Sequence, residues 1–240
     1  MLIKGEGYMN IIIVAIIILV ILIFLKIILQ IDLITLKKIA KNKKLDEITN
    51  AFPSNLEICK KICAMIGNKE VKIEEDTNSK TSLYLVVTNK ISIANLKNSF
   101  TRIQTVAHEC IHSMQDKSML WANFIFSNIY LIYFVVAIIL TICGIFKDTM
   151  LQITILGLLG FVYYFIRSYL ETDAMIKARY LAREYMKYEK ILKPHEMQEI
   201  LENYDIINKI GVKAMNYKLI CSSLIKVLIY AVIAYICGGI

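Results

Sequence analysis

The chain has 240 residues, of which 57% are hydrophobic and 20% charged. A soluble domain is typically about 45–50% apolar and about 25% charged, so the composition excludes a purely soluble, a disordered or a collagen-like protein. The apolar residues form blocks close to the roughly 20 residues that a helix needs to cross a bilayer. These blocks predict a polytopic membrane protein with spans at residues 9–28, 121–146, 149–166 and 220–240.

The two terminal blocks need separate interpretation. The apolar run of the first block is longer than that of a signal peptide, and no small-residue cleavage site follows it, so we expect a permanent anchor. The last block contains Lys226, whose long side chain can reach the membrane interface. A complete crossing and a re-entrant or interfacial segment both remain open for this block.

The net charge of +8 reflects basic residues spread through the polar segments 31–120 and 167–218, where acidic residues accompany them. The densest group, at residues 37–44, directly follows the first block, as expected for a cytoplasmic membrane face. No nucleic-acid motif is present, so we expect the lipid bilayer and not nucleic acid as the partner. Residues 147–148 form the only polar turn between the middle spans, which predicts a tight hairpin. Both polar segments then lie on the same side of the membrane. Their many basic residues predict that this side is the cytoplasm and that both termini point outward.

The first polar segment begins with a predicted helix that starts near Pro53 and has apolar residues at helical spacing. Two short runs, at residues 71–75 and 81–88, are rich in β-branched and aromatic residues and predict a small antiparallel sheet. Helical spacing returns at residues 100–119. The second polar segment is predicted to be helical, with a break near Pro194.

The six cysteines show no disulfide framework. Cys143, Cys221 and Cys237 lie in apolar blocks, whereas Cys59 and Cys63 are four residues apart on a predicted helix. That spacing differs from the CxxC of redox and zinc motifs, so we interpret this pair as packing residues.

The sequence VAHECIHSMQ contains an HExxH motif formed by His108, Glu109 and His112. Four residues are about one helical turn, so both imidazoles project from one face and can bind one metal ion. Glu109 stands beside them as a carboxylate that can take a proton from water, which zinc makes more acidic. The motif predicts one catalytic zinc ion per chain, with Glu109 as the general base.

A catalytic zinc site needs a third protein ligand. Gln115 and Ser118 occupy the positions where a metzincin has glycine and histidine, so that class is excluded. The remaining common ligand is a glutamate on a later helix, and the best candidate is Glu171, just beyond the third predicted span. The hairpin returns the chain to the membrane face that it left, which would place Glu171 near His112.

Asp173, His195 and a row of alanines add further expectations about the site. Asp173 can accept a hydrogen bond from a ligand histidine, or it can pair with Lys177 at i,i+4 spacing. His195 is an alternative third ligand. Small residues share the helix face of Glu171 and would allow close approach of the histidine helix; they are Ala174, Ala178 and Ala182.

HECIHSMQ, followed by a hairpin and then ETDAMIKA, resembles the bacterial membrane-anchored neutral zinc metallopeptidases of the YugP type. Those proteins have an HExGHxxQ helix and a later EFDAS-like stretch. The resemblance implies a gluzincin-like fold in a bacterial cell membrane, zinc on His108, His112 and Glu171, and Glu109 as base. This sequence departs from that pattern at Ile111, which stands in place of glycine, and at residues 110 and 175.

We therefore expect a mainly α-helical polytopic membrane protein whose zincin-like cytoplasmic catalytic part is interrupted by a transmembrane hairpin. The expected segments are an anchor (1–30), a part with the HExxH helix (31–120), the hairpin (121–166), a helical part with the third ligand (167–218) and a terminal membrane segment (219–240).

The predicted function is that of a zinc-dependent endopeptidase acting on polypeptides, which include membrane proteins. Several side chains are candidates for stabilising the oxyanion, namely Arg179, Tyr180, Arg183 and His195. The strand at residues 81–88 could also hold an extended peptide. The alternative is a non-catalytic membrane scaffold, or pseudoprotease, that keeps a metal site. A transporter is disfavoured because, apart from Lys26 at the end of the first span, Lys226 is the only charged residue in a predicted span.

Overall fold

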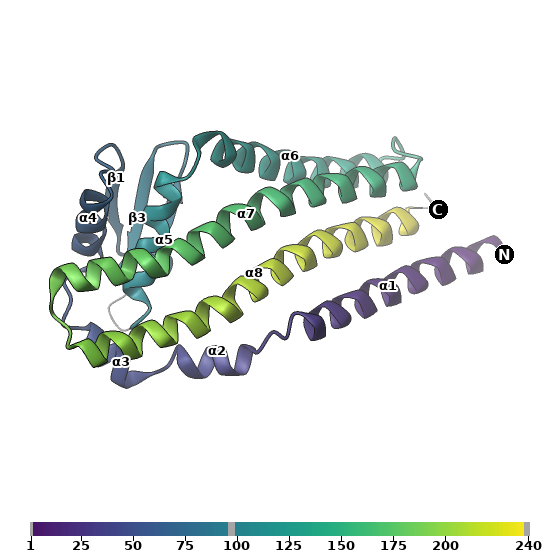
Figure 1. Ribbon diagram of the computed structural model, residues 1–240. Coiled ribbons are helices and arrows are strands. Elements are labelled where there is room, and N and C mark those ends of the chain that lie inside the picture. Colours follow the sequence, from purple (N-terminus) through teal and green to yellow (C-terminus); the bar gives the residue numbers. More distant parts are fainter. Residues whose placement is uncertain (1, 96–98, 238–240) are drawn as a thin grey trace. The chain divides into compact units, whose positions relative to one another are not determined.

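The computed structural model describes the backbone of residues 2–95 and 99–237, and the side chains of these ranges except at residues 2–12 and 14 (Figure 1). In chain order its elements are α1 (Leu2–Ile28), α2 (Leu33–Ile39), α3 (Lys43–Thr49), α4 (Asn55–Met65), β1 (Lys72–Asp76), β2 (Leu83–Leu85), β3 (Lys90–Ala94), α5 (Arg102–Met114), α6 (Lys117–Ile142), α7 (Thr149–Glu189) and α8 (Pro194–Ile236).

The chain divides into two compact units, each built from segments that are distant in sequence. The first unit contains Met1–Ile31, Ala122–Ser168 and Lys213–Ile240, and the second contains Asp32–Trp121 and Tyr169–Val212. Both α7 and α8 therefore have one end in each unit.

The first unit contains the apolar stretches of three helices that are long and apolar enough to cross a membrane, α6, α7 and α8. The predicted span at 121–146 is shifted, because α6 ends at Ile142 and the turn to α7 starts there. Residues 15–28 of α1 would make a fourth span only together with α2, across a bend of 52°. In the predicted first span, the side chains of residues 9–12 and 14 lie outside the described ones. Residues 238–240 of the predicted last span also lie outside the described residues.

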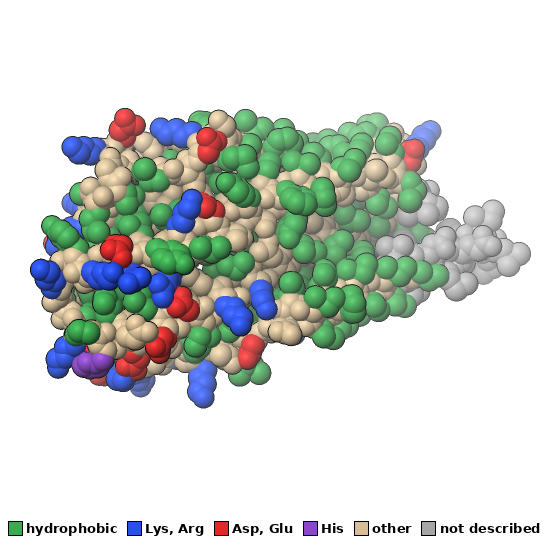
Figure 2. Space-filling model, viewed as in Figure 1, with side chains coloured by type: hydrophobic (Ala, Val, Ile, Leu, Met, Phe, Trp, Pro, Cys, Tyr) green, Lys and Arg blue, Asp and Glu red, His purple; other side chains and the backbone are tan. Residues whose placement is uncertain are grey.

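On the face drawn in Figure 2, the described surface of the first unit is mainly apolar. Large aliphatic and aromatic side chains point outward along α6 and α7, including Ile125, Ile132, Val135, Leu151, Leu158, Phe161 and Phe165. Such a continuous apolar surface is costly in water and favourable in a bilayer.

Aromatic and small residues fill the interior of the first unit. Tyr130, Leu156 and Tyr230 are almost fully buried in one cluster. The Nζ atom of Lys226 lies 4.2 Å from the centre of the Tyr130 ring, where a cation–π contact stabilises the charge. Helix α8 continues unbroken past Lys226 to Ile236.

The second unit contains a three-stranded mixed sheet with the order β1-β3-β2. β1 is parallel to β3, and β2 is antiparallel to it. The prediction of an antiparallel sheet made from two neighbouring runs is therefore wrong, because β3 was missed. Ile91 and Ile93 of β3 are completely buried, whereas the two predicted strands are largely exposed, so β3 takes the centre and they become the edges.

Helix α4 confirms the helix predicted near Pro53. It begins with a capping box, in which the Ser54 hydroxyl accepts from the Glu57 N–H and the Glu57 carboxylate accepts from the Ser54 N–H. Its apolar face joins the main core of this unit, together with side chains from the sheet, α5, α7 and α8, including Ile58, Ile62, Ile91, Ile93, Ile103, Val106, Tyr185 and Tyr204.

The buried guanidinium of Arg102 fixes the start of α5. Its Nη1 donates to the Pro53 carbonyl (2.8 Å) and to Asn55 Oδ1 (3.0 Å), and its Nη2 donates to the carbonyls of Thr49 (2.9 Å) and Phe52 (2.8 Å). Burial lowers the pKa of Arg102. Four charge-assisted bonds thus attach the helix that carries the HExxH motif to the end of α3 and the start of α4.

Candidate metal centre

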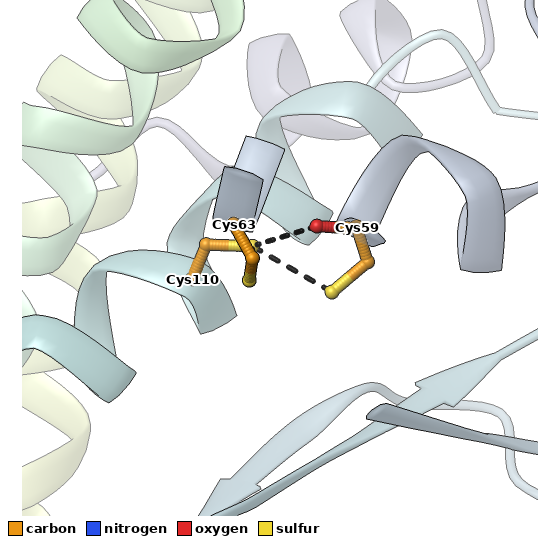
Figure 3. Close-up of side chains that lie close together, drawn as sticks. All are labelled: Cys59, Cys63 and Cys110. Atoms are coloured by element: carbon orange, nitrogen blue, oxygen red, sulfur yellow. Dashed lines mark hydrogen bonds between the residues drawn. The ribbon is translucent and has the colours of Figure 1, made fainter. Parts of the chain in front are cut away.

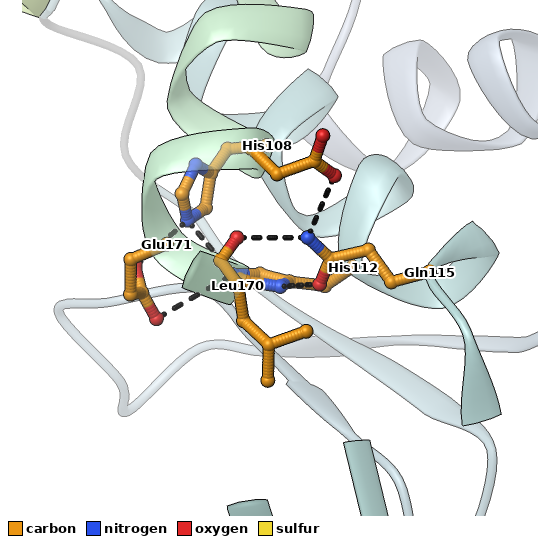
Figure 4. Close-up of polar contacts among 6 residues, drawn as sticks. His108, His112, Gln115, Leu170 and Glu171 are labelled. Carbon is orange, nitrogen blue, oxygen red and sulfur yellow. Dashed lines mark hydrogen bonds and ion pairs between the residues drawn. The ribbon is translucent and has the colours of Figure 1, made fainter. Parts of the chain in front are cut away.

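His108 and His112 lie one turn apart on α5 with their Nε2 atoms facing each other (Figure 4). The two Nε2 atoms are 3.0 Å apart, and the ring planes are nearly perpendicular at 89°. Both side chains are only slightly exposed, at 19% and 11%. The i,i+4 spacing therefore gives the expected paired imidazoles on one helix face.

Glu171 of α7 completes a group of three donors. Its Oε2 is 3.4 Å from His108 Nε2, and its Oε1 is 3.6 Å from His112 Nε2. The ligand atoms of these residues lie within 4.8 Å of one another and could hold a metal ion. Ligands bonded tetrahedrally at about 2.1 Å stand about 3.4 Å apart, so the observed spacing fits a small ion.

Small residues allow α7 to run close to its neighbours at this point. Ala174, Ala178 and Ala182 are all completely buried, as expected from the face that they share with Glu171. Ala178 and Ala182 belong to the same core cluster as residues of α5. A larger side chain on this face would displace α7, and Glu171 with it.

Gln115, the residue after α5, determines which nitrogen of His112 faces the donor group. Its Nε2 donates to the Leu170 carbonyl (2.8 Å) and to Asp173 Oδ2 (3.0 Å). The amide orientation is thereby fixed, and Oε1 accepts a hydrogen bond from His112 Nδ1 at 2.7 Å. With its proton on Nδ1, neutral His112 presents the Nε2 lone pair to a metal ion.

Asp173 fits both interpretations drawn from the sequence, but its link to the ligand histidine is indirect. One of its oxygens pairs with Lys177 at 2.7 Å, as the i,i+4 spacing indicates. The other accepts from the amide of Gln115. Gln115 in turn contacts His112 (Figure 4). Asp173 therefore acts on the histidine through Gln115 and not by direct contact.

The structure does not bring the remaining candidates into the donor group. His195 is exposed at the start of α8 and is not one of the three donors. The Arg179 guanidinium is held in a bidentate ion pair with Asp205, at 2.7 and 2.8 Å, and Tyr180 is 57% exposed. Arg183 lies 3.9 Å from Glu184. None of the four belongs to the donor group, and their role in stabilising an oxyanion stays a prediction.

Glu109 lies on α5 directly after His108 and is 93% buried. A carboxylate so withdrawn from water is unusual unless it has a partner or a chemical role. Sequence reasoning identified Glu109 but missed Gln115 as a positioning residue. Its spacing of three residues from His112 was the available signal, since i,i+3 neighbours can meet on a helix.

No family model, curated protein or solved structure matches the chain. Over the described residues, the fold and the site are those of a mainly helical protein with three candidate membrane-spanning helices, a small sheet and, in the histidine site, a residue group that could hold a metal ion.

Proposed function

We propose that this protein is an integral-membrane zinc endopeptidase. The observation that carries the proposal is the convergence of His108, His112 and Glu171 from α5 and α7, with Glu109 next to the first histidine. Two histidines and one glutamate are the ligand set of many catalytic zinc sites, which leave a position open for water. The resemblance to the YugP-type metallopeptidases supports the same assignment, including their gluzincin-like fold.

Each residue of the site has a role in this proposal. Zinc held by the three side chains would bring the pKa of a water molecule toward about 7 and polarise the scissile carbonyl. Glu109 would accept a proton from the attacking water and return it to the leaving amine. Gln115 holds His112 in the tautomer that can act as a ligand.

Strand β2 offers a binding mode for an extended peptide. Within the described part of the chain it is an edge of the sheet, paired only with β3, and it contacts α5. Its unpaired backbone edge can receive a substrate strand, which would pass close to the helix of the HExxH motif. We propose polypeptides, including membrane proteins, as substrates because Glu171 of the site lies on α7, which continues into the apolar unit.

We further propose that the metal centre faces the cytoplasm of a bacterial cell. The basic residues at positions 37–44 directly follow α1 and the bend after it, and basic residues are abundant throughout the second unit. An excess of lysine and arginine beside spans is typical of the cytoplasmic side.

Metal content tests the ligand set. We expect detergent-purified wild type to contain about one zinc ion per chain, Glu171→Ala to lose it, and His195→Ala and the exposed-site control Glu184→Ala to keep it. Wild type without zinc after reconstitution would contradict the enzyme assignment. Zinc lost in His195→Ala but kept in Glu171→Ala would mean that the third ligand is wrong.

Turnover distinguishes the peptidase from the alternative, a metal-binding scaffold. We expect the zinc-loaded protein to cleave quenched fluorescent casein, and Glu109→Gln to keep its zinc while losing at least about 100-fold in rate. Glu184→Gln, at a carboxylate that is 57% exposed, is the matched control. Equal rates for Glu109→Gln and the control would favour the scaffold.

A further inference from the structure

A second cluster of metal-binding side chains lies in the core of the second unit (Figure 3). The Sγ atom of Cys110 is 3.6 Å from that of Cys59 and 3.6 Å from that of Cys63. All three sulfur atoms lie within 4.8 Å of one another, and the side chains are at most 2% exposed. The sequence paired Cys59 with Cys63 as packing residues and gave no indication that Cys110 joins them.

Helix geometry makes this cluster separate from the histidine site. Cys59 and Cys63 are one turn apart on α4, so both thiols leave the same face of that helix. Cys110 lies midway between His108 and His112 along α5 and therefore projects from about the opposite side of the helix. Helix α5 thus carries histidine ligands on one side and a thiol on the other.

We propose that Cys59, Cys63 and Cys110 form a three-thiolate binding site for copper(I). Thiolates select soft ions such as copper(I), zinc and iron, and disfavour magnesium and calcium. Structural zinc is almost always four-coordinate, whereas only three donors converge among the described residues around this point. This proposal does not depend on the peptidase function.

The spacing of the sulfur atoms is compatible with one ion at their centre. Three sulfur atoms about 2.3 Å from a metal in a plane are about 4.0 Å apart, so small side-chain adjustments bring the observed distances into that range. A disulfide has an S–S length of about 2.05 Å and would leave the third thiol unused. On binding, thiol protons leave to the buffer as copper–sulfur bonds form.

The surroundings of the cluster exclude water. Ile58, Ile62, Ile103 and Ala107 are completely buried in the same core. The Glu109 carboxylate interacts electrostatically with Cys59, but these aliphatic side chains supply no competing ligand, which favours an ion that is stable with three sulfur ligands alone.

An anaerobic titration tests the proposal: the protein competes with a chromophoric chelator for copper(I). The reference protein is the full chain with the other three cysteines changed, Cys143→Ala, Cys221→Ala and Cys237→Ala. We expect it to take up about one copper(I) ion per chain, and the further change Cys110→Ala to abolish this uptake. Adding His108→Ala to the reference instead should leave the uptake unchanged, because that residue lies on the other side of α5.

A second readout keeps the test decisive if a core variant folds poorly. X-ray absorption of the copper-loaded reference protein should show sulfur as the nearest neighbours of the metal. Nitrogen or oxygen neighbours, no uptake by the reference protein, or equal uptake after Cys110→Ala would overturn the proposal. If the reference protein takes up copper(I) but the zinc-loaded wild type does not cleave casein, the result counts against the proposed function alone.

Discussion

Replacement of Gln115 by alanine should weaken metal binding although Gln115 is not a ligand. The side chain makes three hydrogen bonds, to His112 Nδ1 (2.7 Å), the Leu170 carbonyl (2.8 Å) and Asp173 (3.0 Å). Without the amide, the His112 ring can rotate and can move its proton to Nε2, where it blocks coordination. The two acceptors on α7 also lose the bond that ties this helix to the end of α5.

The expected loss of metal affinity follows from the effect that hydrogen-bond partners of ligand histidines have in other metal sites. Loss of a hydrogen-bond partner of a ligand histidine typically lowers metal affinity by about 10–100-fold, which is about 1.4–2.7 kcal/mol. Gln115→Glu should be at least as harmful. A carboxylate can still accept from His112, but its second oxygen would face the Leu170 carbonyl and the Asp173 carboxylate.

Zinc affinity can be measured by competition with a chromophoric chelator in detergent. The control is Gln198→Ala on α8, where the lost amide contacts only Glu202 on an exposed surface. We expect the control to bind as wild type does. Wild-type affinity in both Gln115→Ala and Gln115→Glu would refute the reasoning that this amide sets the tautomer of His112.

Three further predictions address stability. Arg102→Met should lower the free energy of unfolding of the second unit by at least about 3 kcal/mol, because four acceptors lose a charged donor. Thermal melts measure this effect, and Arg183→Met, at a more exposed position, should change the free energy of unfolding little. Gly160→Val should lower the melting temperature in detergent, since a Cβ there meets the Tyr130 hydroxyl at 2.9 Å, whereas Gly157→Val has open space and should be neutral. Zinc at about 100 times its Kd should stabilise wild type by about 2.7 kcal/mol, and His112→Ala should abolish that shift.

The parts that follow local rules could be predicted from the sequence. Helical spacing put His108 and His112 on one face, and the apolar residues at helical spacing after Pro53 located α4. Glu171 was found by topology, because a hairpin of two apolar helices must bring the chain back.

Other features depend on tertiary contacts that no local pattern encodes. The short run at residues 90–94 has weak strand signals, yet its buried isoleucines place it at the centre of the sheet. Helix α5 ends at Met114 because Gln115 turns to an extended conformation, in which its side chain reaches α7. Cys110 meets Cys59 only through the packing of α4 on α5.

The donor group itself constrains how the chain can cross a membrane. His112 and Glu171 belong to the same compact unit, but the segment between them, Ala122–Ser168, belongs to the other. If α6 crosses a bilayer, then α7 must cross it in the opposite direction, because an odd number of crossings would leave the two ligands on different sides. The same reasoning makes the hairpin a structural requirement of the site. A chain shortened to residues 32–121 would keep both histidines and lose the carboxylate, and we expect it to bind zinc far more weakly than the full chain.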